Sequence, residues 1–228
     1  MDINMDINKI CSMVDHTELS VIAKREDILT LCADAEKYSV ASVCVAPSYV
    51  KLAADTLGGR VKVCTVIGFP NGYSTTAVKC FETRDALENG ADEIDMVINL
   101  GLLKDGRFCE LEEEIRAIKK ICKDKILKVI VETCLLTDEE IAQMCRIVHS
   151  AGADFIKTCT GFAAGKATVE DINLFKAHIG PNVRMKASSG MTTLDEGAVF
   201  VEMGCERLGS KLLVNIAKAD GVTVEGGY

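Results

Sequence analysis

The sequence predicts an α/β fold: a single (β/α)8 TIM barrel that spans residues 1–228 as one domain, with a short N-terminal capping segment. Short apolar, β-prone runs alternate with longer segments of helical periodicity eight times along the chain, which is typical of a closed parallel barrel. The length of 228 residues fits one such barrel. No linker-like tract divides the chain, and no GxGxxG loop indicates a nucleotide-binding open sheet.

The expected elements follow from these periodicities. The strands are expected at Ile10–Asp15, Ala41–Ala46, Val61–Ile67, Glu93–Asn99, Leu127–Glu132, Phe155–Thr158, Val183–Ala187 and Cys205–Gly209. The helices are expected at Glu26–Tyr38, Thr75–Asn89, Glu110–Ile121, Asp138–His149, Val169–His178, Leu194–Glu202 and Lys211–Ala219. The opening MDIN duplication is interpreted as the capping segment or a frayed end.

Composition narrows the possible partners. The net charge of −8 argues against nucleic acid as the main partner, although a few local cations and backbone N–H groups suffice for one small phosphate. No apolar run reaches the length of a membrane span, so no membrane partner is expected. The start carries no signal-peptide pattern.

Eleven cysteines occur without a CxxC pair or a cysteine–histidine cluster of zinc spacing. Several, such as Cys44, Cys64 and Cys159, lie in apolar segments, so most are expected to be small buried hydrophobes in a reducing compartment. The chain is therefore expected in the cytoplasm, with no metal site.

A weak internal repeat aligns the even-numbered strands. The segments 90–95, 152–157 and 204–209 follow one plan, and 39–44 follows it more loosely. The residue at the sixth position should then be structurally equivalent in each strand. Because alternate strands fill each interior layer of such a barrel, these residues should share one layer near the C-terminal end, where active sites lie: Cys44, Asp95, Lys157 and Gly209.

The odd-numbered strands carry basic residues near their starts. Strand alternation places Lys62, Lys128 and Arg184 on the inner side, toward Glu93. Buried charges need partners, so these four residues are expected to form a structural ion cluster that plugs the N-terminal end of the barrel.

Two lysines end neighbouring apolar strands, Lys157 on the sixth and Lys186 on the seventh. A free lysine has a pKa of about 10.4 and is protonated at neutral pH, whereas a nucleophilic lysine must be neutral. Desolvation and a nearby cation both favour the neutral amine, and two inward lysines would supply both. With only three histidines, two of them in helical segments, a metal-dependent aldolase is disfavoured.

Three carboxylates accompany the lysines. Asp95 either pairs with a lysine or transfers protons through a water molecule while a carbinolamine forms and breaks down. Asp15, at the end of the first strand, either binds a substrate hydroxyl or tethers Lys186. Glu132 is either a salt-bridge partner or an orienting group.

The chain resembles the deoxyribose-phosphate aldolase family along nearly its whole length. The motifs that carry the resemblance stand in the family's order: Val14-Asp15-His16-Thr17, Ser42-Val43-Cys44-Val45, the segment 66–72, the segment 91–99, Lys128-Val129-Ile130-Val131-Glu132-Thr133, Phe155-Ile156-Lys157-Thr158 with Thr160-Gly161-Phe162, and Lys186-Ala187-Ser188.

The resemblance implies reversible cleavage of 2-deoxy-D-ribose 5-phosphate to D-glyceraldehyde 3-phosphate and acetaldehyde, a step of deoxyribonucleotide catabolism that needs no cofactor. It assigns the Schiff base to Lys157 and proton transfer to Asp95. Lys186 is expected to perturb Lys157 and to help in proton exchange. It further implies substrate contacts at Asp15, Cys44, Thr158 and Gly161, and a phosphate site at Ser188, Ser189, Gly190, Gly209 and Ser210. A homo-oligomer, dimer or tetramer, is expected.

The last two loops depart from the family pattern. Where the family usually has Ala-Ser-Gly-Gly and an isoleucine-arginine-threonine run, this chain reads 187–193 as Ala-Ser-Ser-Gly-Met-Thr-Thr. Where the family has Gly-Thr-Ser, it has Gly209-Ser210-Lys211, and Lys211 either supplies charge to a phosphate or faces solvent. These departures concern phosphate affinity more than the chemistry at Lys157.

Two other functions remain open. One is a different Schiff-base barrel, transaldolase-like or a keto-acid aldolase, acting on another phosphorylated sugar; product analysis separates it from the first. The other is a barrel whose altered loops have made it a binding protein. The joint presence of Lys157, Lys186 and Asp95 argues against this second alternative. The terminal Tyr228 is expected to be a disordered end or, less favoured, an arm over the barrel mouth.

Overall fold

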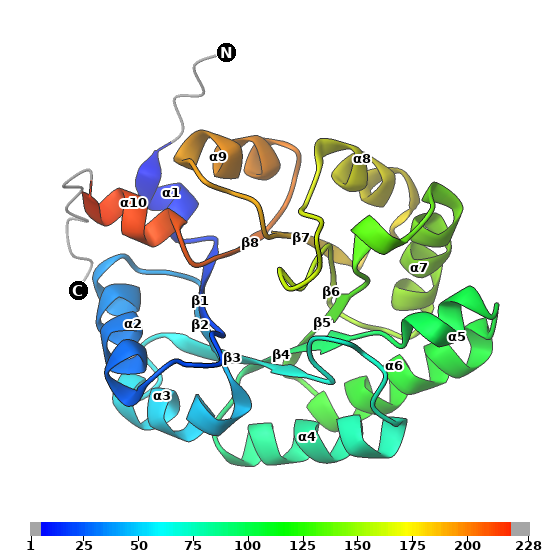
Figure 1. The fold of residues 1–228 in the computed structure, drawn as a ribbon, viewed down its shortest axis with the longest axis horizontal. Helices are drawn as coiled ribbons and strands as arrows, with labels where there is room; N and C mark the ends of the chain where they lie inside the picture. The colour runs from blue at the N-terminus through cyan, green and yellow to red at the C-terminus, as the bar shows by residue number, and fades with distance from the viewer. Residues whose placement is uncertain (1–5, 220–228) are drawn as a thin grey trace.

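The computed structural model describes residues 6–219 and forms the closed parallel barrel that the sequence predicts. Each strand pairs with its two neighbours in chain order, and the first pairs with the last. In Figure 1 the strands surround the centre and the helices form the outer ring. The strands are β1 (Val14–Glu18), β2 (Ser42–Val45), β3 (Lys62–Ile67), β4 (Glu93–Val97), β5 (Ile126–Ile130), β6 (Phe155–Lys157), β7 (Arg184–Ser188) and β8 (Arg207–Ser210).

The helices cover the outer face of the barrel. They are α1 (Ile7–Cys11), α2 (Arg25–Lys37), α3 (Val50–Leu57), α4 (Thr76–Glu88), α5 (Leu100–Lys104), α6 (Phe108–Cys122), α7 (Asp138–Ser150), α8 (Val169–His178), α9 (Leu194–Glu202) and α10 (Leu213–Ala219). Short 3-10 turns lie at Pro47–Tyr49 and Thr133–Leu135. The strands are buried on both faces, as parallel sheets require, so the main apolar core lies between barrel and helices.

The chain start differs from the prediction. The run from Ile10, expected as a strand, begins inside helix α1, and the strand starts only at Val14. The Asp6 side chain caps this helix by accepting from the Asn8 N–H at 3.0 Å. Ile10 and Cys11 are buried, and the helix packs against α9 and α10. The first residues of the predicted strand therefore form the buried face of a helix. An apolar run this short does not distinguish a buried helix face from a strand.

Two further helices were missing from the predicted set, α3 and α5. Helix α3 follows a 3-10 turn that opens with Pro47, where the missing N–H costs nothing, and it ends at Gly58 in a left-handed conformation. Both signals are visible in the sequence, but the segment is short. Helix α5 has only five residues and is capped by Asn99, which accepts from the Leu102 N–H at 3.3 Å.

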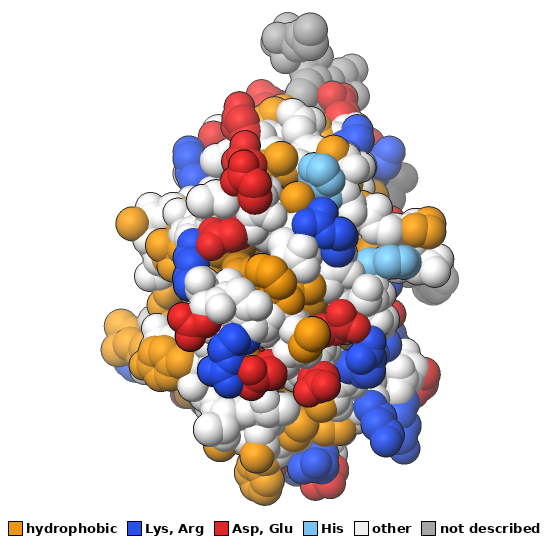
Figure 2. All heavy atoms as spheres, turned by 90° about the vertical axis from the view of Figure 1, so that its right-hand side faces the viewer, with side chains coloured by type: hydrophobic (Ala, Val, Ile, Leu, Met, Phe, Trp, Pro, Cys, Tyr) orange, Lys and Arg blue, Asp and Glu red, His pale blue; other side chains and the backbone are white. Residues whose placement is uncertain are grey.

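The outer surface mixes charges of both signs. On the face shown in Figure 2, acidic and basic side chains alternate with small apolar areas and do not gather into separate patches. Among residues 6–219, no helix is long and apolar enough to cross a membrane. The expectations for the MDIN opening up to Met5 and for Tyr228 fall outside the described residues.

Candidate active site

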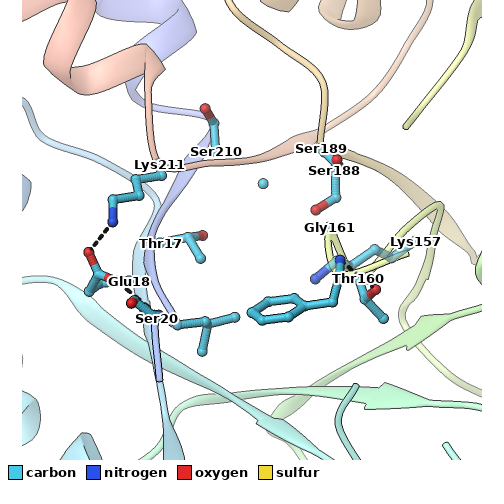
Figure 3. Close-up of a pocket in the computed structure, with 13 residues that line it drawn as sticks. Thr17, Glu18, Ser20, Lys157, Thr160, Gly161, Ser188, Ser189, Ser210 and Lys211 are labelled. Carbon is cyan, nitrogen blue, oxygen red and sulfur yellow. Dashed lines mark hydrogen bonds and ion pairs between the residues drawn. The ribbon is translucent and has the colours of Figure 1, made fainter. Parts of the chain in front are cut away.

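A cavity of about 290 Å³ opens at the C-terminal end of the barrel. The ends of β1, β6, β7 and β8 and the loops that follow them form its wall. Figure 3 shows Lys157, Thr160 and Ser188 on one side of this cavity and the Glu18–Lys211 ion pair on the other. The C-terminal face is where barrels of this architecture place their chemistry.

Lys157 ends β6 and extends into this cavity. Its Nζ donates to Asp95 Oδ2 at 2.8 Å, and the side chain is 4% exposed. The neighbouring strand places Lys186 in register with Lys157, and the Lys186 Nζ contacts the same Oδ2 at 2.7 Å. One carboxylate oxygen therefore lies between two lysine nitrogens, of which only Lys157 lines the cavity.

Asp15 tethers Lys186 from the other side, one of the two roles considered from the sequence. Its Oδ2 lies 2.5 Å from the Lys186 Nζ, and its Oδ1 accepts from Ser42 at 2.7 Å and Arg207 at 2.6 Å. Burial disfavours the charged form, but Asp15 and Asp95 outweigh it and raise the pKa of Lys186 above its ordinary value. Lys186 is thus a cation beside Lys157 at neutral pH.

The carboxylate of Asp95 remains ionised in this setting. Burial would raise its pKa, but the ammonium groups of Lys128, Lys157 and Lys186 hold the pKa well below its usual value. The ionised carboxylate accepts from Lys157 and lies next to the position where a carbinolamine would form, as required of a group that relays protons.

The predicted ion cluster exists but has a different membership. Lys128 is fully buried and contacts Glu93 at 2.6 Å, as expected. It also contacts Asp95 at 2.9 Å, so the cluster continues into the lysine site. Arg207, absent from the prediction, donates to both oxygens of Glu93 at 2.8 and 2.9 Å.

Lys62 and Arg184 do not belong to this cluster, which corrects the prediction. Both are the first residues of their strands, and among residues 6–219 neither forms an ion pair with Glu93, which pairs with Lys128 and Arg207. Lys62 is exposed and lies 3.9 Å from Asp92, outside the barrel interior. The Arg184 guanidinium lies over the Phe155 ring at 4.0 Å.

Glu132 orients the loop that follows β6. It accepts from the Thr160 N–H at 3.2 Å and from the Thr160 hydroxyl at 2.5 Å. Glu132 itself has a left-handed backbone with φ 56°. Of the two roles considered from the sequence, the contacts favour the orienting group, because among the described residues no lysine or arginine pairs with it.

The loops after β7 and β8 meet at the expected phosphate site. A Cβ at Gly209 would lie 2.4 Å from Ser188 Oγ and 3.1 Å from Lys186 Cε, so any larger residue there would displace Ser188. The Ser210 hydroxyl accepts from Leu212 N–H and Leu213 N–H at the start of α10. Ser189, which stands where the family usually has glycine, has φ 77°, a region that favours glycine.

The predicted site residues fall into two groups. Those that line the cavity are Lys157, Gly161, Ser188, Ser189, Gly209 and Ser210. Those that do not line it are Asp15, Cys44, Asp95, Thr158, Lys186 and Gly190. Thr158 is buried and exchanges hydrogen bonds with the Ser188 backbone, so it joins the two loops.

Several lining residues were not singled out from the sequence. Thr17, Glu18, Leu19 and Ser20 line the cavity because β1 extends to Glu18, three residues beyond its predicted end. Phe162 also lines it and packs edge-on against Phe69, with ring centroids 5.1 Å apart. The Phe162 motif was visible in the sequence, but its partner in space was not.

Comparison with known proteins agrees with this geometry. The family model described as "DeoC/LacD family aldolase" matches residues 9–204. A deoxyribose-phosphate aldolase of Streptococcus agalactiae is 50% identical over 98% of this chain and 100% of its own length. One of Streptococcus pyogenes is 49% identical over 97% of this chain and 99% of its own.

Solved structures show the same fold. A structure from Coccidioides immitis has a TM-score of 0.92 and 40% identity, and covers 96% of this chain and 88% of that one. The deoxyribose phosphate aldolase of Aeropyrum pernix, described as a tetramer, has a TM-score of 0.84 and 28% identity over 95% and 92% of the two chains. On the matched family model and near-full-length identity, this chain belongs to the deoxyribose-phosphate aldolase family of DeoC/LacD aldolases.

Proposed function

We propose that this protein reversibly cleaves 2-deoxy-D-ribose 5-phosphate to D-glyceraldehyde 3-phosphate and acetaldehyde through a Schiff base on Lys157. One observation carries the proposal. Lys157 is the cavity-lining member of a pair of lysines that contact the same Asp95 oxygen, and its partner Lys186 is held as a cation by two carboxylates. The relatives' names supply the substrate.

The first half of the reaction forms the imine. The neutral Lys157 amine attacks the C1 aldehyde of the open-chain sugar, and the carbinolamine then loses water to give a protonated imine. The Lys186 ammonium favours the neutral amine by charge repulsion. Asp95, through a water molecule, takes and returns the protons that these steps move.

The second half breaks the carbon–carbon bond. The C3 hydroxyl loses its proton, the C2–C3 electron pair moves toward the iminium nitrogen, and D-glyceraldehyde 3-phosphate leaves. The enamine that remains on Lys157 is then protonated at C2, and water hydrolyses the imine to acetaldehyde. The iminium is the electron sink throughout.

We propose that the phosphate binds between the loops after β7 and β8. Ser188, Ser189, Gly209 and Ser210 line the cavity there. The hydroxyls of Ser188 and Ser189 are the donors offered to the phosphate, because the N–H groups of these two residues already donate to Thr158 and to the Gly209 carbonyl. Lys211 supplies positive charge at the rim, where it pairs with Glu18 at 2.6 Å. Gly190 does not line the cavity. Its φ of +83° shapes the loop that carries Ser188 and Ser189.

Of the four residues expected to contact the substrate, we propose that only Gly161 contacts it directly and that the other three act through neighbouring residues. Gly161 lines the cavity, and Thr158 acts by holding the Ser188 backbone. Cys44 and Asp15 act from beneath the site, near Asp95 and Lys186 respectively.

We further propose that the protein works in the cytoplasm as a homo-oligomer, a dimer or a tetramer. All eleven cysteines are free and eight of them are buried, which suits a reducing compartment. The tetrameric relative from Aeropyrum pernix supports assembly. Light scattering in solution measures the oligomeric state directly.

Product analysis tests the function. Purified protein is incubated with 2-deoxy-D-ribose 5-phosphate, and acetaldehyde and D-glyceraldehyde 3-phosphate are measured separately. We expect equimolar products, and none from Lys157→Leu. A different aldehyde product from another phosphorylated sugar would support the alternative Schiff-base aldolase, and no turnover of any sugar phosphate would support a binding protein.

A further inference from the structure

Two cysteines lie side by side beneath the catalytic cavity. Cys44 on β2 and Cys64 on β3 are paired residues in the parallel register, and Asp95 on β4 is two residues beyond the partner of Cys64. The two thiols pack with Val66 under Leu19 and Phe69. Neither thiol forms a bond or moves a proton in the aldol chemistry described above, although both are buried next to the carboxylate on which that chemistry depends.

The three side chains offer donor atoms to a common point. The two sulfur atoms and one Asp95 oxygen all lie within 4.8 Å of one another. Cys64 Sγ donates to Asp95 Oδ1 at 3.2 Å. The two oxygens of Asp95 are divided: Oδ1 faces Cys64 and Lys128, whereas Oδ2 holds Lys157 and Lys186.

This donor set suits a thiophilic divalent cation. Zinc binds thiolate at about 2.3 Å and carboxylate oxygen at about 2.0–2.2 Å, in tetrahedral geometry that separates donors by roughly 3.5–4 Å. Because the donors lie within 4.8 Å of one another, the spacing needs a contraction of about 1.3 Å at most. Because the ligands come from three adjacent strands of a closed barrel, little chain entropy is lost when they converge.

The charges around the two thiols are compatible with the exchange of their protons for a divalent metal ion. Replacing two thiol protons by one Zn²⁺ or Cd²⁺ leaves the total charge of the cluster unchanged, so the surrounding lysines and carboxylates keep their balance. The side-chain contact with Cys64 is the main cause that lowers the pKa of Cys44, whereas burial raises the pKa of Cys64 well above its ordinary value, so the metal itself must displace the Cys64 proton. Lys128 Nζ lies 3.2 Å from Cys64 Sγ and can donate to the bound thiolate.

We propose that Cys44, Cys64 and Asp95 form an inhibitory site for Zn²⁺ and related thiophilic cations. The metal takes both thiolates and Asp95 Oδ1 and leaves a fourth position for water. A carboxylate bound to a cation is a poor proton acceptor, so Asp95 no longer serves Lys157, and the aldolase stops without loss of its fold.

The metal reaches this site from the cavity. Leu19 lines the cavity above, and Leu19 and Phe69 both line the neighbouring apolar cavity of about 230 Å³. These two partly buried side chains are the ones that cover the thiols, so their rotation opens the path.

Binding is tested first, without reference to activity. The background variant is Cys109→Ser/Cys134→Ser, which removes the two exposed thiols. Reduced, metal-free background protein is titrated with Cd²⁺ and followed by thiolate-to-metal charge-transfer absorbance and by native mass spectrometry. We expect one tightly held ion. Loss of a second-shell partner alone costs about 10- to 100-fold in affinity, so adding Cys64→Ala or Cys64→Val should weaken binding at least about 100-fold.

Matched controls keep the result decisive. Cys80→Ala, at a partly buried cysteine on α4, should leave Cd²⁺ binding unchanged. Two variants at Cys64 guard against misfolding of either one, and circular dichroism checks both. Absence of charge-transfer absorbance in the background protein, or equal absorbance in a folded Cys64 variant, overturns the proposal.

Inhibition is tested next, on each protein relative to its own metal-free rate. Zn²⁺ at the concentration that fills the site should abolish cleavage by the background protein, and a chelator should restore it. The Cys64 variants should resist the same concentration. Inhibition of the Cys64 variants to the same degree, or full activity of the metal-loaded background protein, contradicts the inhibitory role. A chain that binds Cd²⁺ but cleaves no sugar would refute the proposed function and leave the metal site intact.

Discussion

Replacement of Lys186 by methionine should remove the positive charge that repels the ammonium form of Lys157. The nitrogens of Lys157 and Lys186 lie 2.8 and 2.7 Å from the same Asp95 oxygen, so their separation cannot exceed the sum of these distances. At that limit of about 5.5 Å, two unit charges repel by about 3 kcal/mol at an effective dielectric constant of about 20. Removal of this repulsion should therefore favour the ammonium form of Lys157 by about 100-fold.

The assay is the pH dependence of kcat/KM for cleavage. Lys186→Met should lower kcat/KM at pH 7 by about 100-fold, and the acid limb of its profile should move to higher pH by about two units. Lys186→Arg keeps the charge and should keep the position of the limb, even if the larger side chain lowers the rate. An unmoved limb in Lys186→Met would refute the electrostatic role.

Lys79→Met controls for the loss of a buried lysine. Lys79 is fully buried on α4, where it contacts Glu114 at 2.6 Å and lies outside the barrel interior. Breaking one partner of a buried ion pair costs about 3–5 kcal/mol. Both variants should therefore lose free energy of unfolding on this scale, measured by denaturant titration. Only Lys186→Met should move the pH profile.

Three further predictions test other residues. Burial lowers the pKa of His16 from 6.5 to about 4, so the unfolded chain binds this proton first as pH falls. Stability should drop by about 3 kcal/mol between pH 6.5 and 4, and less in His16→Gln, measured by denaturant titration; equal slopes would contradict this. Ser189→Gly should raise the free energy of unfolding by about 1 kcal/mol, because Ser189 has φ 77°, and a loss would show that its side chain stabilises the loop. Ser210→Glu should raise KM for deoxyribose 5-phosphate far more than for free deoxyribose, because a carboxylate repels the phosphate. Ser210→Ala controls for the lost cap of α10. Equal effects on both sugars would show that the phosphate binds elsewhere.

Periodicity and the internal repeat were enough to predict the barrel and the convergence on Asp95. The even-strand alignment placed Cys44, Asp95 and Lys157 in one layer, and the contacts agree: Asp95 lies 2.8 Å from Lys157 and within 4.8 Å of the Cys44 sulfur. This worked because strand alternation is strict in a closed barrel, so a residue's position in the repeat determines its side of the sheet.

Strand starts and long side chains were not predictable in the same way. Lys62 and Arg184 have the correct alternation, but each is the first residue of its strand, where a long side chain can leave the barrel. Arg207 is likewise the first residue of β8, yet its guanidinium reaches Glu93 and Asp15. Register between strands decides which of these charges finds a buried partner, and no local pattern encodes that register.

Borohydride trapping with acetaldehyde tests the central claim most directly. Acetaldehyde should form an imine with the lysine that carries the chemistry, and reduction should fix a two-carbon alkyl group there, located by peptide mass mapping. The account predicts one modification at Lys157 and little at Lys186, because only Lys157 lines the cavity while Lys186 is held as a cation by Asp15 and Asp95. Dominant labelling of Lys186, or no label on either lysine, would contradict it.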